Sequence, residues 1–218
     1  MNDLNKDTII QEIEKNKIIA ILRGIKKEKL IPLCEALYKG GIRLLELTYS
    51  NTSDTETAQS IKMLSEHFKG KLYIGAGTVT TSKQVALTKK AGGLFIISPN
   101  TEKKVIKKTL KCGLVSIPGA LTPSEVCCAN TYGADFVKIF PITSMGADYI
   151  KAIKAPLSAI KLLAVGGIDE NNMTDYLKAG VCGFGIGSNI NDKKMIENND
   201  WEGIAELAEK YTVVINGA

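Results

Sequence analysis

Lys138 and Glu46 are charged residues placed inside stretches of sequence that are otherwise apolar. Lys138 lies within Phe-Val-Lys-Ile-Phe at residues 136–140, and Glu46 lies within Leu-Leu-Glu-Leu at residues 44–47. Because burying a charge is costly unless it is paired or functional, both residues are candidates for chemistry. Burial lowers the pKa of an amine, and a neutral amine attacks carbonyl carbon, so Lys138 is a candidate Schiff-base nucleophile. The alternative is a lysine whose ammonium reaches solvent at the end of a strand.

Glu46 and Arg23 could assist such a nucleophile. A buried carboxyl group with a raised pKa can move protons, so Glu46 is a candidate general acid and base. The alternative for Glu46 is a structural salt bridge, for example with Lys138. Arg23 follows an apolar run and precedes Gly24, and its guanidinium suits bidentate binding of a carboxylate or a phosphate. The alternative for Arg23 is an ion pair with Glu46.

Small residues follow three further apolar runs. Thr78 comes after Gly-Ala-Gly at residues 75–77, which we interpret as a tight glycine turn. The Thr78 hydroxyl could bind a substrate carboxylate or cap the next helix. The pairs Gly166-Gly167 and Gly187-Ser188 follow the last two runs. Loops at these places in α/β barrels often bind phosphate through backbone N–H groups, so both pairs are candidate phosphate ligands. The alternative is that they form simple tight turns.

The elements that must position these residues alternate along the chain. Eight short apolar runs, rich in β-branched residues, are separated by longer amphipathic stretches. Near-continuous apolar runs are typical of parallel strands that are buried on both faces. The runs are residues 17–23, 42–48, 71–76, 93–98, 114–118, 134–140, 160–165 and 181–186.

The amphipathic stretches predict helices. Apolar stripes occur around residues 30–37, 105–110 and 149–153, and glycines that can end a helix precede most of the apolar runs. The segments 122–125 and 169–172 carry residue types that start helices. Residues 7–15 predict one more helix ahead of the first run.

Eight strand–helix units without a linker predict one domain over residues 1–218, a (β/α)8 TIM barrel with an extra N-terminal helix. A doubly wound open sheet is the alternative, but no Gly-x-Gly-x-x-Gly follows the first run. Side chains alternate along a strand. Lys138 and Glu46 should therefore point into the lumen of the barrel, near the carboxyl ends of the strands, where barrel active sites form.

Composition excludes several classes of protein. The 218 residues are 44% apolar and 23% charged and carry a net charge of +5, with one histidine, His67, placed at an expected surface helix end. Metal sites and Ser-His-Asp triads depend on well-placed imidazoles, so we expect no metal and no cofactor. Arginine occurs only at Arg23 and Arg43, which argues against nucleic-acid binding.

The chain shows no sign of membrane insertion or secretion. No apolar stretch approaches the length of a membrane span, and the polar start of the chain does not predict a secretory signal. Five unevenly spaced cysteines suggest reduced thiols. We therefore expect a cytoplasmic protein with no membrane partner.

A set of short motifs carries a family resemblance. In chain order they are Ile-Leu-Arg-Gly at 21–24, Leu-Glu-Leu-Thr at 45–48, Ile-Gly-Ala-Gly-Thr-Val at 74–79, Ile-Ser-Pro-Asn at 97–100, Ile-Pro-Gly at 117–119, Val-Lys-Ile-Phe-Pro at 137–141 and Gly-Gly at 166–167. The set resembles the 2-keto-3-deoxy-6-phosphogluconate (KDPG) and 4-hydroxy-2-oxoglutarate aldolase family. That family consists of class I, metal-free, Schiff-base-forming (β/α)8 aldolases that are usually homotrimers.

The resemblance implies roles for individual residues. Lys138 resembles the Schiff-base lysine, Glu46 the general acid and base, and Thr78 the contact to the pyruvate-derived carboxylate. Arg23 is similar to an arginine of the related phosphogalactonate aldolases. The remaining residues implied to bind the phosphorylated keto acid are Pro99, Phe140, Gly166, Gly167, Gly187 and Ser188.

The implied reaction is cleavage of 2-dehydro-3-deoxy-6-phosphogluconate to pyruvate and glyceraldehyde 3-phosphate, with 4-hydroxy-2-oxoglutarate as a second substrate. Tyr49-Ser50-Asn51 stands where many phosphogluconate aldolases have an arginine, and Val165 stands where many have threonine. Residues 98–100 and 164–167 resemble the phosphogalactonate branch of the family more than the phosphogluconate branch. The alternative substrate is therefore 2-dehydro-3-deoxy-6-phosphogalactonate. Other classes left open are a phosphate-binding barrel isomerase or epimerase without a covalent intermediate, and a non-catalytic metabolite-binding barrel.

Overall fold

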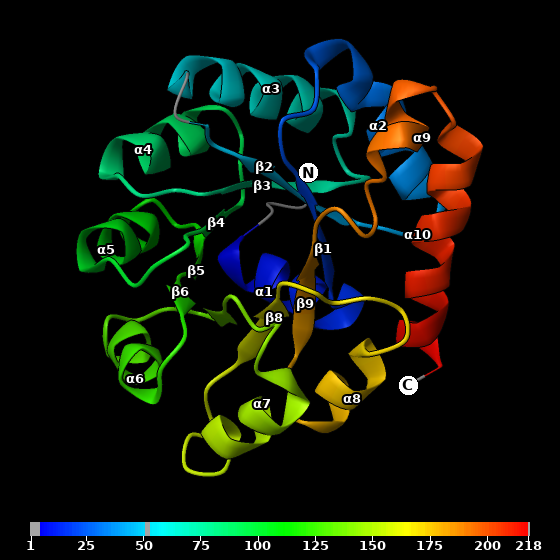
Figure 1. Ribbon diagram of the computed structural model, residues 1–218. Helices are drawn as coiled ribbons and strands as arrows, with labels where there is room; N and C mark the ends of the chain where they lie inside the picture. The colour runs from blue at the N-terminus through cyan, green and yellow to red at the C-terminus, as the bar shows by residue number, and fades with distance from the viewer. Residues whose placement is uncertain (1–4, 51–52, 218) are drawn as a thin grey trace.

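A ring of parallel strands surrounded by helices forms the protein (Figure 1). The computed structural model describes residues 5–50 and 53–217. The sheet order is β5-β4-β3-β2-β1-β9-β8-β7-β6, and every neighbouring pair is parallel. The strands are β1 (Ile18–Leu22), β2 (Leu44–Thr48), β3 (Tyr73–Gly77), β4 (Phe95–Ile97), β5 (Val115–Ile117), β6 (Gly119–Ala120), β7 (Val137–Ile139), β8 (Leu162–Val165) and β9 (Gly183–Ile186).

The chain itself closes the ring at Pro118. β5 pairs with β4, and β6, which begins one residue after Pro118, pairs with β7. Because proline has no N–H to donate to a ladder, the strand is interrupted at this residue and changes partner across it. The two segments together form the fifth of eight barrel strands. The sequence placed the end of this strand at residue 118, whereas pairing continues to Ala120.

Helices cover the outside of the ring (Figure 1). Each packs an apolar stripe against the outward faces of the strands, as the sequence pattern predicted. The helix predicted to start within residues 169–172 begins at Met173, since the Asp169 carboxylate instead accepts from the N–H groups of Asn171 and Asn172 in the preceding turn. The helices are α2 (Lys27–Lys39), α3 (Asp54–His67), α4 (Ser82–Lys90), α5 (Lys103–Lys111), α6 (Pro123–Thr131), α7 (Gly146–Lys154), α8 (Met173–Lys178), α9 (Lys193–Glu197) and α10 (Trp201–Asn216).

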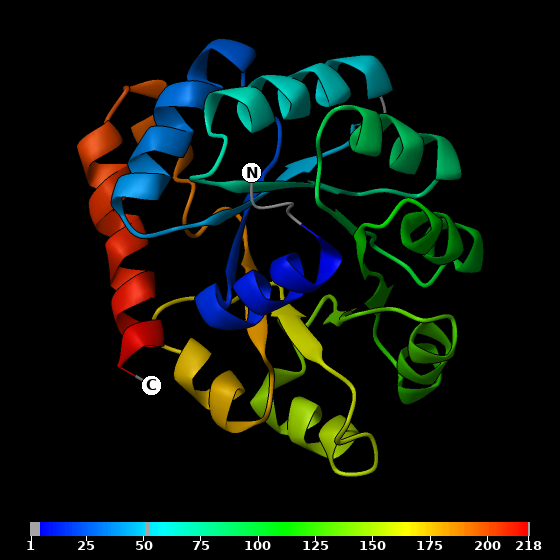
Figure 2. The ribbon, with the colours of Figure 1, turned by 180° about the vertical axis from the view of Figure 1, so that it is seen from behind.

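The extra N-terminal helix, α1 (Lys6–Asn16), lies across one end of the ring (Figure 2). Its Ile9 and Ile13 are buried in the lumen with Phe95 and Phe136. An ion pair from Lys161 to Glu14 at 2.8 Å holds the helix to the start of β8. The helix therefore fills the amino-terminal end of the barrel with apolar side chains.

The alternation of side chains matches the expected faces. Leu45 and Leu47 of β2, and Val137 and Ile139 of β7, lie in the core between strands and helices. The residues between them on each strand therefore face the lumen. Across residues 5–50 and 53–217, no helix combines the length and apolar character needed to cross a membrane.

Candidate active site

A cavity of about 870 Å³ lies at the carboxyl ends of the strands. Its walls come from the ends of β1, β2, β3, β7, β8 and β9 and from the loops that follow them. All ten residues singled out from the sequence line this one cavity: Arg23, Glu46, Thr78, Pro99, Lys138, Phe140, Gly166, Gly167, Gly187 and Ser188.

Lys138 is the central residue of β7 and is 7% exposed. Its Nζ lies 4.5 Å from the centroid of the Phe140 ring. Burial lowers the pKa of Lys138 below its ordinary value; the nearby Arg23 cation acts in the same direction, while Glu46 opposes both. The strand thus presents an amine that releases its proton more readily than a surface lysine does.

Glu46 is the central residue of β2 and is 1% exposed. Burial raises its pKa, and the positive charges of Lys138 and Arg23 oppose that effect. Its Oε2 is buried without a hydrogen-bond partner, and no lysine or arginine nitrogen of the described residues lies within 4.0 Å of its carboxylate. Glu46 is therefore not held in a structural salt bridge, and it remains able to exchange a proton with a ligand.

Gly77 makes room for the Glu46 carboxylate. A Cβ at position 77 would lie 1.5 Å from Glu46 Oε1, and a Cβ at Gly75 would lie 2.2 Å from the Phe95 ring. Both glycines belong to β3, and neither has a positive φ. The interpretation of residues 75–77 as a tight turn was therefore wrong: these glycines supply space inside the barrel rather than a chain reversal.

Thr78 and Arg23 form a polar pair at the mouth of the cavity. Thr78 has φ 56°, a left-handed conformation that is strained for a β-branched residue. Its Oγ1 accepts a hydrogen bond from Arg23 Nη2 at 3.0 Å. The Thr78 hydroxyl does not cap the following helix, because Thr81 fills that place. Arg23 pairs with this hydroxyl and not with Glu46.

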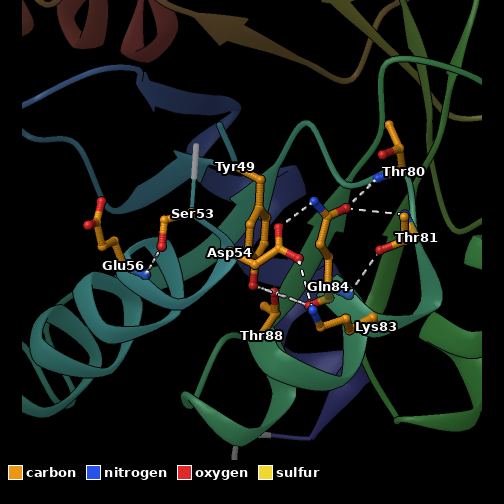
Figure 3. Close-up of polar contacts among 9 residues, drawn as sticks. All are labelled: Tyr49, Ser53, Asp54, Glu56, Thr80, Thr81, Lys83, Gln84 and Thr88. Atoms are coloured by element: carbon orange, nitrogen blue, oxygen red, sulfur yellow. Dashed lines mark hydrogen bonds and ion pairs between the residues drawn. The ribbon is translucent and has the colours of Figure 1, made fainter. Parts of the chain in front are cut away.

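Figure 3 shows the network that holds the loop after Thr78. Gln84 Oε1 accepts from the N–H groups of Thr80 and Thr81 at 2.9 and 3.2 Å, and Gln84 Nε2 donates to Asp54 Oδ1 at 2.9 Å. The buried Tyr49 hydroxyl lies 3.3 Å from the Gln84 carbonyl oxygen. Tyr49, Asp54 and the loop from β3 to α4 are thereby joined through one glutamine.

The segment that stands where many phosphogluconate aldolases have an arginine is only partly described. Tyr49 is buried, with its hydroxyl 3.0 Å from Thr88 Oγ1, so it supports α4 rather than the cavity. Ser50 lines a second hollow of about 600 Å³ between α2 and α3. Asn51 lies outside the described residues.

The two glycine pairs follow β8 and β9 and form a further part of the cavity wall. Gly166 and Gly167 have φ 105° and 70°, values that favour glycine. A Cβ at Gly187 would meet no atom within 4 Å, so its Cα faces open space. In the described part of the chain, the N–H groups of these three residues and of Ser188 have no acceptor. This wall can therefore donate hydrogen bonds to an anionic ligand.

Sequence reasoning missed three polar residues of the cavity. Asn189, Asn191 and Lys193 also line it. Asn191 is 5% exposed and donates from Nδ2 to the Ile21 carbonyl oxygen at 2.8 Å. Their position just after a glycine-rich strand end was the feature of the sequence that could have indicated a place in the cavity.

Metal-binding clusters are missing from the part of the chain that is described: no group of three or more His, Cys, Asp and Glu residues could hold an ion there. His67 ends α3 with a 45% exposed side chain, and its Nε2 lies 3.7 Å from Glu35. The five cysteines are unpaired.

A closed ring of parallel strands, with a lysine and a glutamate buried at its carboxyl end, defines an α/β-barrel enzyme whose site can do proton and carbonyl chemistry. Three comparisons with known proteins refine this class. The family described as KDPG and KHG aldolase matches residues 9–207. A probable 2-dehydro-3-deoxy-6-phosphogalactonate aldolase of Rhizobium meliloti is 36% identical over 79% of this chain and 81% of its own.

Two further relatives agree. The 2-dehydro-3-deoxy-6-phosphogalactonate aldolase of Escherichia coli is 35% identical over 81% of this chain and 85% of its own. The structure of KDPG aldolase from Legionella pneumophila, with pyruvate captured as a covalent carbinolamine, superposes with a TM-score of 0.83 at 31% identity, covering 90% of this chain and 94% of that one. The chain belongs to the KDPG and KHG aldolase family and is a carbon–carbon lyase.

Proposed function

We propose that the chain is a class I aldolase that cleaves 2-dehydro-3-deoxy-6-phosphogalactonate to pyruvate and glyceraldehyde 3-phosphate. The observation that carries the proposal is Lys138, buried at the carboxyl end of β7 with a lowered pKa and facing the same cavity as Glu46. The Legionella relative, which binds pyruvate as a covalent carbinolamine, supports the same chemistry here.

In this mechanism the Lys138 amine attacks the C2 ketone, and loss of water forms an iminium that withdraws electrons from C3. Glu46, acting through a water molecule, removes the proton of the C4 hydroxyl, and the C3–C4 bond breaks. Glyceraldehyde 3-phosphate leaves, and the remaining enamine is protonated at C3 and hydrolysed to pyruvate. The raised pKa of Glu46 suits a group that must take up and return a proton.

The two ends of the substrate fit different parts of the cavity wall. The Thr78 hydroxyl and the Arg23 guanidinium would bind the carboxylate, next to Lys138. The unpartnered N–H groups of Gly166, Gly167, Gly187 and Ser188 would bind the phosphate. Pro99 and Phe140 complete the apolar part of the lining. Bound in this way, the substrate would hold its C4 hydroxyl between the two ends, where Glu46 could act on it.

The galactonate substrate is favoured over the gluconate substrate, which the family resemblance had placed first. The two curated relatives described above, at 36% and 35% identity, are both named for phosphogalactonate. 2-Dehydro-3-deoxy-6-phosphogluconate is the second candidate, supported by the Legionella KDPG aldolase at 31% identity. The two substrates differ in configuration at C4, so contacts around that carbon must discriminate them.

Parallel turnover assays test the proposal. Pyruvate release is followed with lactate dehydrogenase for both phosphorylated substrates and for 4-hydroxy-2-oxoglutarate, with Lys138→Met as the inactive control. The proposal predicts the highest kcat/KM for the galactonate series. A higher kcat/KM for the gluconate series would assign the second candidate, and turnover by Lys138→Met would exclude the Schiff-base mechanism.

The homotrimer, implied by the family resemblance, and the cytoplasmic location, expected from the cysteines and the polar start of the chain, remain predictions. Light scattering on the purified chain tests the first, and a mass of one or two chains would contradict it. Cell fractionation tests the second.

A further inference from the structure

Side chains hold three carbonyl oxygens in the two glycine loops of the cavity. The Gly167 carbonyl oxygen accepts from Asn172 Nδ2 at 2.8 Å, and the Ile168 carbonyl oxygen accepts from Asn189 Nδ2 at 2.9 Å. The Asn189 carbonyl oxygen accepts from the Tyr211 hydroxyl at 3.2 Å. None of these three oxygens accepts from a backbone N–H within the described ranges.

Asn189 is the residue that joins one loop to the other. It belongs to the loop between β9 and α9, and its side chain donates to the loop between β8 and α8. In the described part of the chain, no other hydrogen bond runs directly from one loop to the other. The pairing of β8 with β9 fixes where the two loops begin, and the Asn189 bond joins them beyond the strand ends.

The Tyr211 hydroxyl restrains the backbone at Asn189. Tyr211 is 1% exposed and lies on α10, which packs outside the barrel. Because a buried hydroxyl keeps a hydrogen-bond partner, its bond to the Asn189 carbonyl oxygen restrains the backbone of that loop. The last helix of the chain is thereby connected to the wall of the cavity.

We propose that Asn189, supported by Tyr211, is a positioning residue that clamps the two glycine loops at the spacing required to bind the phosphate of the substrate. The inference rests on the proposed function, in which these loops bind that phosphate. A phosphate that accepts hydrogen bonds from both loops requires N–H donors at a fixed separation. A loop that moves away no longer donates to the phosphate. Lys138 and Glu46 lie on other strands and do not depend on the clamp.

Two variants remove the clamp in different ways. Asn189→Ala removes the bond between the loops, and Tyr211→Phe removes only the hydroxyl behind Asn189 while keeping the aromatic ring. Matched controls are Asn198→Ala, at an exposed asparagine that ends α9, and Tyr176→Phe, at a buried tyrosine of α8. Neither side chain forms a hydrogen bond with another residue that the structure describes. The Tyr211→Phe variant keeps the test decisive if Asn189→Ala fails to fold.

The readouts separate phosphate binding from the chemistry at Lys138. We expect both clamp variants to raise KM for the phosphorylated substrate about five- to tenfold, the effect of losing one ordinary hydrogen bond, with kcat within about twofold. Inhibition by inorganic phosphate should weaken in parallel. Borohydride trapping of pyruvate should keep its wild-type dependence on pyruvate concentration, because pyruvate carries no phosphate. Both control variants should match the wild type.

Two outcomes overturn the inference: KM for the phosphorylated substrate unchanged in both clamp variants, or trapping of pyruvate weakened as much as phosphate binding. Each is distinct from failure of the proposed function, which would show as a wild-type enzyme that forms no pyruvate adduct at all.

Discussion

Gly77→Ala should displace the Glu46 carboxylate without touching Lys138. The added methyl would lie 1.5 Å from Glu46 Oε1 and 2.2 Å from its Cδ, whereas ordinary contact begins near 3.4 Å. The carboxylate must therefore move by about 2 Å. Because φ at Gly77 is not positive, alanine causes no backbone strain there, and the effect is steric.

The expected loss of activity follows from that displacement. A misplacement of about 1 Å can cost about 10²-fold in rate, and removing a general acid or base costs about 10²–10⁴-fold. We therefore expect kcat for aldol cleavage by Gly77→Ala to fall by about 10²-fold or more. The pyruvate adduct on Lys138 should still form, since the amine and its strand are unchanged. Thermal unfolding would show that the variant remains folded.

A double-mutant cycle separates this cause from general disruption. In a Glu46→Ala background the carboxylate is gone, so Gly77→Ala should cost no more than about twofold further. The reasoning is refuted if Gly77→Ala alone cleaves substrate within twofold of the wild type. It is equally refuted if the full loss persists in the Glu46→Ala background.

Three further predictions concern the same cavity. Glu46 raises and Arg23 lowers the pKa of Lys138. When pyruvate trapping is measured against pH, the acid limb should therefore move to higher pH in Arg23→Met and to lower pH in Glu46→Gln. Shifts of the two variants in the same direction would contradict this prediction. Thr78→Gly and Thr78→Ala both remove the hydroxyl, but only glycine adopts φ 56° without strain. In urea unfolding, Thr78→Gly should therefore be more stable than Thr78→Ala by about 1 kcal/mol. Equal midpoints would show that the backbone at this position is unstrained. Gln84→Leu should lower the free energy of unfolding by about 1–3 kcal/mol, since the N–H groups of Thr80 and Thr81 lose their acceptor. An unchanged urea midpoint would mean that water replaces the side chain.

The fold could be predicted because its signals are local. Each strand is a short apolar run, each helix has its own stripe and caps, and their alternation leaves few architectures. Lys138 and Glu46 could be placed in the lumen for the same reason, because a charge within an alternating strand marks one face. The interruption at Pro118 was visible as a proline, but its exchange of partner strands depends on closure of the ring.

The contacts that could not be predicted join residues far apart in the chain. Gly77 and Glu46 are neighbours only because β2 and β3 pair in one register, so the role of that glycine was invisible in the sequence. Arg23 and Thr78 each had two plausible partners, and only the folded barrel selects the bond between them. The links from Asn189 to Ile168 and from Tyr211 to Asn189 depend on how two loops and the last helix pack.

Reductive trapping tests the central claim most directly. The purified chain is treated with pyruvate and sodium borohydride, digested, and mapped by mass spectrometry, with Lys138→Met and pyruvate-free samples as controls. We predict one stable adduct, on Lys138, that survives a strong chelator in the reaction and is missing from both controls. No adduct, or an adduct on a different lysine, would contradict it.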